Sequence, residues 1–145
     1  MNRLFSCFLI GLMFISAHSY AGTVIWSGAV YSNGAPTAPI KLVLGRNYQI
    51  KVSGTLNLGK WWQKGLPLLE DACYEFNEQV SPSPLVSIKN SINISICTGK
   101  YNSDHVYLST PFIAVQNSVH FWIYDTDYSD NEGALQVEII ELNNN

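Results

Sequence analysis

Apolar and polar residues alternate along much of this chain, as in β-strands with one buried and one solvated face. The segment 48–52 (YQIKV) is the clearest example, and residues 23–31 (TVIWSGAVY) add a run rich in β-branched and aromatic side chains. Turn residues such as Asn33 and Gly34 separate these segments. We therefore expect strands at 23–31, 40–44, 48–52, 85–88, 92–96, 106–108, 112–115, 119–124 and 134–142.

About eight strands, with no amphipathic helix of ordinary length, predict an all-β fold, namely an antiparallel β-sandwich or barrel. Only the segment 55–80 departs from the strand pattern, and we expect a long connection there with one short helix at 68–76. The sequence SPSP at 81–84 is typical of a turn. Neither an internal repeat nor a domain boundary is visible, so the sequence predicts a single domain.

The first 21 residues have the features of a secretory signal peptide. Arg3 provides the positive charge, residues 4–15 form an apolar core too short to span a bilayer, and Ser19 and Ala21 suit a cleavage site. We expect this segment to be removed, which leaves a mature domain of residues 22–145. No other segment is long and apolar enough to cross a membrane, so the expected location is the periplasm or the extracellular space.

The charge of the expected mature domain argues against two classes of partner. This domain retains seven of the eight Lys and Arg residues and all eleven acidic residues, which gives a formal charge of −4. Because no basic patch is present in the sequence, we expect no binding to nucleic acid or to an anionic membrane surface.

Two cysteines, Cys73 and Cys97, remain after Cys7 leaves with the signal peptide. In an exported chain two cysteines most simply form one disulfide, although a pair of buried thiols is the alternative. The bond would close a loop of roughly 25 residues, which stabilises the fold by about 3 kcal/mol if its effect is on chain entropy.

An acidic loop between two apolar runs is the most informative feature of the chain. Asp125, Asp127, Asp130 and Asn131 lie close together in the sequence between the strands expected at 119–124 and 134–142. Hard oxygen ligands of this kind, crowded into one loop, are what a Ca²⁺ site needs. Acidic and amide residues are also common in ordinary hairpin loops, where they bond local backbone groups.

Aromatic residues provide candidate ligand contacts. Trp61 and Trp62 are adjacent, and sugar rings often stack on exposed Trp, but Trp is also a common core residue. Tyr128 lies within the acidic loop, where it would flank a ligand or cap the loop. The two histidines of the mature chain, His105 and His120, lie in no recognisable nucleophile motif, so we expect structural or solvated roles for them and no enzymatic activity.

Several motifs follow one another in an order that is typical of one family. They are WSGAV at 26–30, VSG at 52–54, a Trp-bearing connection, CYEF at 73–76, IY at 123–124 and DNEGALQVEI at 130–139. This order resembles the soluble, calcium-dependent, galactose-binding lectins of bacteria. The resemblance implies a jelly-roll type β-sandwich, and it spans nearly the whole mature domain.

The resemblance also implies a calcium site in which the metal binds two sugar hydroxyls. Asp130 and Asn131 match the paired side-chain ligands before the last strand, Asp125 or Asp127 stands for an earlier carboxylate, and a backbone carbonyl ligand would lie near Asn57. The loop 124–131 is about three residues shorter than in that family, and its sugar-contacting residues before the first cysteine have no counterpart in LLED at 68–71. The resemblance therefore does not extend to galactose specificity.

These observations leave two main functional hypotheses. The first is a secreted or periplasmic, lectin-like protein that binds a glycan with Ca²⁺. The second is a periplasmic protein-binding module, an enzyme inhibitor or an immunity protein, whose acidic loop inserts into a basic cleft of a protein partner. A structural or adhesive subunit that pairs through exposed strand edges is a third.

Overall fold

The computed structural model describes residues 22–59, 69–77 and 80–143. This part of the chain contains thirteen strands and no helix, which confirms the predicted all-β fold. The strands are β1 Gly22–Tyr31, β2 Ile40–Lys41, β3 Asn47–Ser53, β4 Leu56–Leu58, β5 Leu69–Glu70, β6 Tyr74–Asn77, β7 Val80–Pro84, β8 Ile88–Asn90, β9 Val106–Leu108, β10 Phe112–Ile113, β11 Ser118–Val119, β12 Phe121–Ile123 and β13 Asn131–Leu142.

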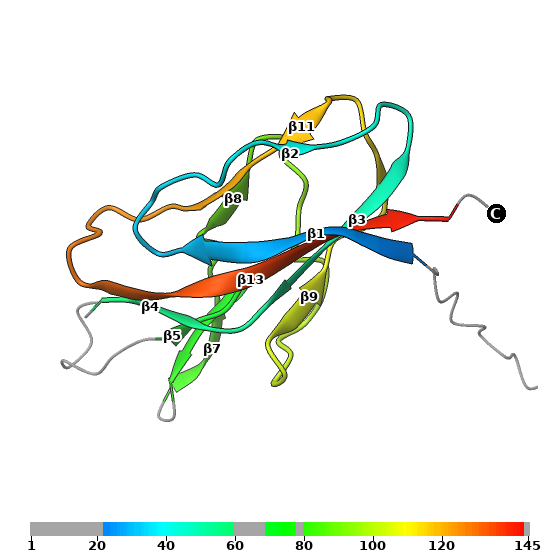
Figure 1. Ribbon diagram of the computed structural model, residues 1–145. Helices are drawn as coiled ribbons and strands as arrows, with labels where there is room; N and C mark the ends of the chain where they lie inside the picture. The colour runs from blue at the N-terminus through cyan, green and yellow to red at the C-terminus, as the bar shows by residue number, and fades with distance from the viewer. Residues whose placement is uncertain (1–21, 60–68, 78–79, 144–145) are drawn as a thin grey trace, which may run out of the picture.

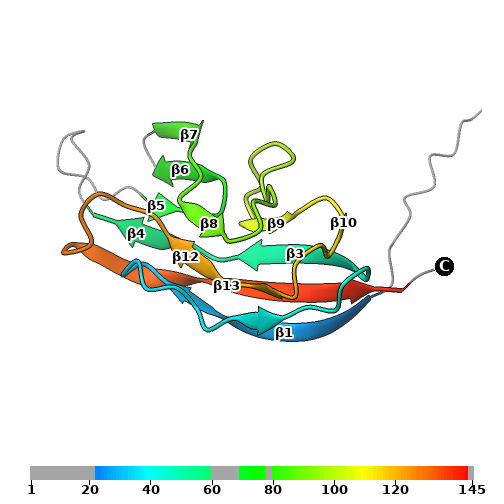
Figure 2. The same ribbon diagram turned by 90° about the horizontal axis from the view of Figure 1, so that it is seen from above.

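The long strand β13 organises the main antiparallel sheet. Figures 1 and 2 show β1 and β13 side by side along the length of the molecule, paired from Gly22 with Leu142 to Tyr31 with Ala134. On its other edge β13 pairs with β3 over its C-terminal half and with β4 at its start. The sheet continues from β4 through β5 and β6 to β7, while β9 and β10 extend it beyond β3.

Two small sheets form the second layer of the sandwich. β8 pairs with β12, and β2 pairs with β11. In Figure 1 β2, β8 and β11 lie above the β1–β13 pair, whereas β5, β7 and β9 lie below it. One hydrophobic core joins the layers, because buried residues of both belong to the same cluster: Tyr48, Ile50, Val52, Leu135, Val137 and Ile139 of the main sheet, and Ile40, Ile88, Val119, Phe121 and Ile123 of the small sheets.

The period-two pattern of the sequence is what places these residues inside. In β3 and β13 alternate side chains are buried, and their neighbours form ion pairs on the outer face, such as Lys51 Nζ to Glu138 Oε2 at 2.9 Å. Alternation of this kind commits each strand to one register, because a slip by one residue would expose every apolar side chain.

A β-bulge at Ile25 in β1 directs Trp26 toward the core. The register of β1 against β13 shifts between Val24 and Trp26. The Trp26 ring then stacks on Phe121 with centroids 6.3 Å apart and lies across Gly28, where an added Cβ would meet the ring at 2.5 Å. The glycine therefore provides the space that the ring occupies.

Four local expectations are wrong. The strand expected at 85–88 falls mostly on the connection between β7 and β8, because residues 85–87 belong to no strand. The short helix expected at 68–76 is instead a turn between β5 and β6, because this segment pairs with β4 and is closed by Asp71. The SPSP segment is part of β7, the last strand in the sheet order, where an edge position tolerates proline. The segment 92–96 forms no strand, because the Asn90 side chain bonds both the N–H and the C=O of Ile94 and replaces a strand partner.

Candidate functional site

The Cys73–Cys97 disulfide is present, with Cα atoms 5.4 Å apart. It ties the turn before β6 to the segment that precedes β9. Disulfides persist in oxidising compartments, so the bond is consistent with a location outside the cytoplasm.

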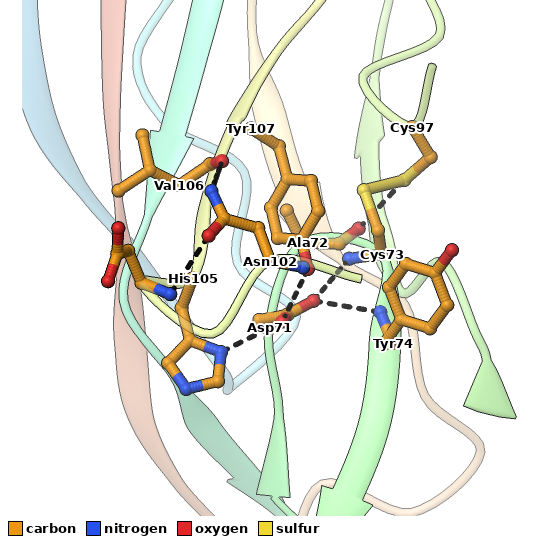
Figure 3. A network of polar contacts seen from close by, with 10 residues as sticks. Asp71, Ala72, Cys73, Tyr74, Cys97, Asn102, His105, Val106 and Tyr107 are labelled. Carbon is orange, nitrogen blue, oxygen red and sulfur yellow. Dashed lines mark hydrogen bonds and ion pairs between the residues drawn. A yellow bond between two sulfur atoms is a disulfide. The ribbon is translucent and has the colours of Figure 1, made fainter. Parts of the chain in front are cut away.

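Beside the disulfide, a buried carboxylate organises a network of polar contacts (Figure 3). Oδ1 of Asp71 accepts hydrogen bonds from the backbone N–H groups of Cys73 and Tyr74, both at 2.8 Å. Its Oδ2 accepts one from the Tyr107 hydroxyl at 2.9 Å, and Nδ1 of His105 lies 3.0 Å from the same atom. A buried carboxylate with four polar partners is well compensated, so Asp71 holds the β5–β6 turn against β9.

His105 is part of this anchor. Its backbone adopts a φ of 53°, which directs the ring back toward Asp71, and the ring stacks on Phe76 with centroids 4.6 Å apart. Burial raises the pKa of Tyr107 to about 12, so its hydroxyl remains a donor to Asp71. The expected structural role of His105 agrees with these contacts.

Glu70, next to Asp71, is buried with much poorer compensation. Its Oε2 accepts one hydrogen bond, from the Ser87 hydroxyl at 2.6 Å. Burial raises its pKa to about 7 against the opposing effect of that hydrogen bond, and the nearby charges of Glu75, Asp125 and Asp71 raise it further. Glu70 thus lies within electrostatic reach of the start of the acidic loop.

The acidic loop is a crossover between the layers and not a hairpin, because β12 pairs with β8 while β13 belongs to the main sheet. Local hydrogen bonds shape it. Asp125 Oδ1 accepts the N–H of Thr126 at 2.6 Å, and Asp127 Oδ1 accepts that of Ser129 at 2.9 Å. The hydrogen bonds from Ser129 lower the pKa of Asp127, which keeps this exposed carboxylate ionised.

Tyr128 packs the loop against the turn that follows β1. Its hydroxyl donates to the C=O of Ile123 at 3.4 Å and accepts the N–H of Asp125 at 3.1 Å. The ring lies across Gly34, where an added Cβ would meet it at 2.6 Å. Tyr128 is 39 % exposed, so it caps the loop and still has part of its surface open to solvent.

The end of the loop contacts two other segments. The carboxylate of Asp130 lies directly against Gly59, which follows β4, so only glycine fits there. Nδ2 of Asn131 donates to the C=O of Ser32 at 2.9 Å. Asp130 and Asn131 are therefore brought together with the ends of β1 and β4.

One polar atom at this junction is not compensated. Oδ1 of Asn131 is buried, yet it accepts no hydrogen bond from the residues that the structure describes. A buried acceptor without a donor costs about 1–3 kcal/mol unless a ligand, an ion or water satisfies it. Among the described buried side-chain polar atoms, it is the one that lacks a hydrogen-bond partner.

The donor set fits part of a calcium shell. Within residues 22–59, 69–77 and 80–143, no three His, Cys, Asp or Glu side chains converge on one metal position. Calcium also binds amide oxygens, backbone carbonyls and water. Asp130 and Asn131 would be its side-chain ligands, with the remaining oxygens supplied by carbonyls, by water or by the carboxylates of Asp125 and Asp127.

Trp61 and Trp62, the other predicted ligand contacts, lie outside the described residues. Sequence reasoning did not single out Glu70, Asp71 or Ser87 as members of buried polar contacts. The signal that could have revealed the two acids is their position in an apolar segment just before Cys73, where an ionisable side chain needs a specific partner.

Comparison of the chain with protein-family models, with curated proteins and with solved structures finds no match. Among the described residues, no helix is long and apolar enough to cross a membrane.

Proposed function

We propose that this protein is an exported, lectin-like protein that binds carbohydrate with Ca²⁺ at the acidic end of the sandwich. The buried, uncompensated Oδ1 of Asn131, next in sequence to the Asp130 carboxylate, is the observation that carries the proposal. A divalent cation would satisfy that acceptor and offset the negative charge of the loop.

The surroundings of this junction suit a saccharide ligand. Calcium held by few protein groups keeps coordination positions open, and vicinal sugar hydroxyls are suitable oxygen ligands for them. Exposed aromatic surface lies close by in the sequence, since Tyr124 and Tyr128 are 57 % and 39 % exposed. In the sequence, one residue, Lys60, separates Trp61 and Trp62 from Gly59, the residue that Asp130 contacts.

A glycan array probed with the labelled protein tests the proposal, once with Ca²⁺ and once with EDTA. We expect saturable binding to a defined set of glycans that EDTA abolishes. Asp130→Asn removes the charge of the carboxylate but keeps the shape of the side chain, and it should abolish binding. Glu132→Gln makes the same charge change one position beyond Asn131 and should preserve binding. Binding that persists in EDTA, or that both variants weaken equally, would refute the site.

The same loop also supports the second hypothesis, a protein-binding module. Asp127, Asp130 and Glu132 are exposed together with Tyr124 and Tyr128. Tyr is enriched at protein interfaces, and the carboxylates would complement a basic surface of the partner. In this case a partner should be captured from periplasmic extract equally well with Ca²⁺ and with EDTA. High ionic strength should weaken the capture, because the attraction is electrostatic.

A further inference from the structure

The outward face of the small β8–β12 sheet presents an aromatic surface that the proposed calcium site does not use. Burial alternates in both strands, so Phe121, Ile123 and Ile88 face the core while Trp122 and Lys89, which are paired in register, face outward. His120 lies on the same side of β12 as Trp122, with ring centroids 5.5 Å apart and planes tilted by 31°.

A pocket of about 260 Å³ opens beside Trp122. Trp122, Ile94 and Ile96 provide apolar surface, and Lys89, Asn93 and Ser95 provide polar groups. None of the acidic-loop residues lines it. Binding sites for drug-sized ligands span roughly 300–1,000 Å³, so this pocket suits a single small ring.

The segment 90–96, which lines the pocket together with Trp122, is held in a defined shape. The Asn90 side chain donates to the C=O of Ile94 at 2.7 Å and accepts its N–H at 2.9 Å. Asn93 adopts a φ of 56°, so the chain turns sharply between these bonded residues. The side chains of Asn93 and Ser95 are exposed, while Lys89 Nζ is positioned by a 2.7 Å hydrogen bond to the C=O of Val86.

This combination selects an amphipathic ring. A pyranose sugar has an apolar C–H face, which packs on an aromatic ring, and hydroxyls at its rim, which bond to amide, hydroxyl and ammonium groups. A purely apolar ligand would form no hydrogen bonds with Lys89, Asn93 or Ser95, the polar groups at the edge of the pocket. We infer that the Trp122 pocket is a saccharide site of its own, which binds one monosaccharide ring without calcium.

The site goes beyond the proposed function, and two saccharide sites on one domain would allow bivalent binding to a branched glycan. Because the test is carried out in EDTA, its outcome does not depend on the calcium site.

The probes are the methyl glycosides of galactose, glucose, mannose and fucose, with phenol as a ring of similar size that has a single hydroxyl. The readout is the indole N–H resonance of Trp122 in ¹H–¹⁵N spectra of the purified protein, assigned by its loss in Trp122→Phe.

We expect at least one sugar to shift this resonance saturably and phenol to shift it less. In Trp122→Ala, which lacks the indole, binding is followed through the backbone amide resonances of the pocket residues Asn93 and Ser95. It should be weakened roughly tenfold or more, since the stacking surface is removed. Asn93→Gly removes the amide at a backbone conformation that glycine adopts freely, so it should fold and bind more weakly. Tyr31→Ala, which removes another exposed aromatic ring outside the pocket, should have no effect.

Well-dispersed spectra of each variant show that it is folded. The inference is overturned if none of the four sugars shifts the resonance saturably, if phenol binds as well as the best sugar, or if Tyr31→Ala weakens binding as much as Trp122→Ala does.

Discussion

Two adjacent buried acids, Glu70 and Asp71, differ in how they are compensated. Among the described residues Asp71 has four hydrogen-bonding partners and Glu70 has one. Burial raises the pKa of Glu70 to about 7. An unfolded chain would ionise Glu70 near 4.5. The folded protein is therefore destabilised as pH rises from the lower to the higher of these values, and the penalty is constant above them.

Glu70→Gln should remove this pH-dependent penalty, because glutamine is neutral at every pH and its carbonyl still accepts the Ser87 hydroxyl. The variant should gain up to about 3 kcal/mol over the native protein at pH 8 and almost nothing at pH 4. Urea unfolding at both values measures the difference. Equal effects at the two values would show that folding does not raise the pKa of Glu70. Glu75→Gln provides a control for the loss of a nearby charge.

Gly28 is required by the ring of Trp26. Gly28→Ala places a Cβ 2.5 Å from that ring, which is fixed by its stacking on Phe121. We expect a loss of roughly 1–3 kcal/mol in unfolding free energy. Gly99→Ala meets nothing within 4 Å and should leave stability nearly unchanged. If both variants unfold at the same urea concentration, the ring does not need the space at Gly28.

At the residue scale the sequence predicted which cysteines pair, but it did not predict which acidic side chains are buried or what they contact. It predicted the Cys73–Cys97 bond, because two cysteines in an exported chain leave little choice. It did not single out Glu70 and Asp71 as buried, because their burial depends on β4, Ser87 and β9, which are distant in sequence.

At the element scale, β5, β6 and β7 form an arm of the sheet in which the strands make few hydrogen bonds with one another. Each strand is short, β7 lies at an edge, and the arm joins the rest through β4, the disulfide and Asp71. Short strands gain little from pairing alone, so these tertiary links determine whether the arm is ordered.

Reduction of the disulfide should therefore destabilise this arm first. Cys73→Ala with Cys97→Ala should lower the unfolding free energy by about 3 kcal/mol. Amide hydrogen exchange should accelerate in β5 and β6 more than in β3 and β13. Uniform acceleration across all strands would contradict the view that the bond stabilises the arm locally.

The long or strongly alternating strands were predictable from the sequence, whereas the short ones were not. β1, β3 and β13 carry their own period-two or β-branched pattern. β4 and β5 have only two or three residues and exist because β13 and β6 provide partners. The expected helix at 68–76 was wrong for the same reason, since local propensity cannot account for pairing with a distant strand.

At the scale of the whole molecule, the sandwich brings the ends of β1 and β4 to the acidic loop. The alternation of the sequence predicted the fold class, and the acidic cluster identified the loop. The sequence could not show that the loop crosses between sheets, because this depends on the topology. For the same reason it could not show that Asp130 contacts Gly59 or that Asn131 donates to Ser32. The Trp122 pocket was missed for the same reason.

Thermal unfolding of the disulfide-intact protein, with excess Ca²⁺ and with EDTA, tests the central claim most directly. A ligand that binds only the folded state stabilises it by about 2.7 kcal/mol at a hundredfold excess over Kd, and the midpoint should rise on the order of 10 °C. Asp130→Asn should lose this rise and Glu132→Gln should keep it. Identical midpoints in Ca²⁺ and EDTA, or an equal rise in Asp130→Asn, would contradict a calcium site at this loop.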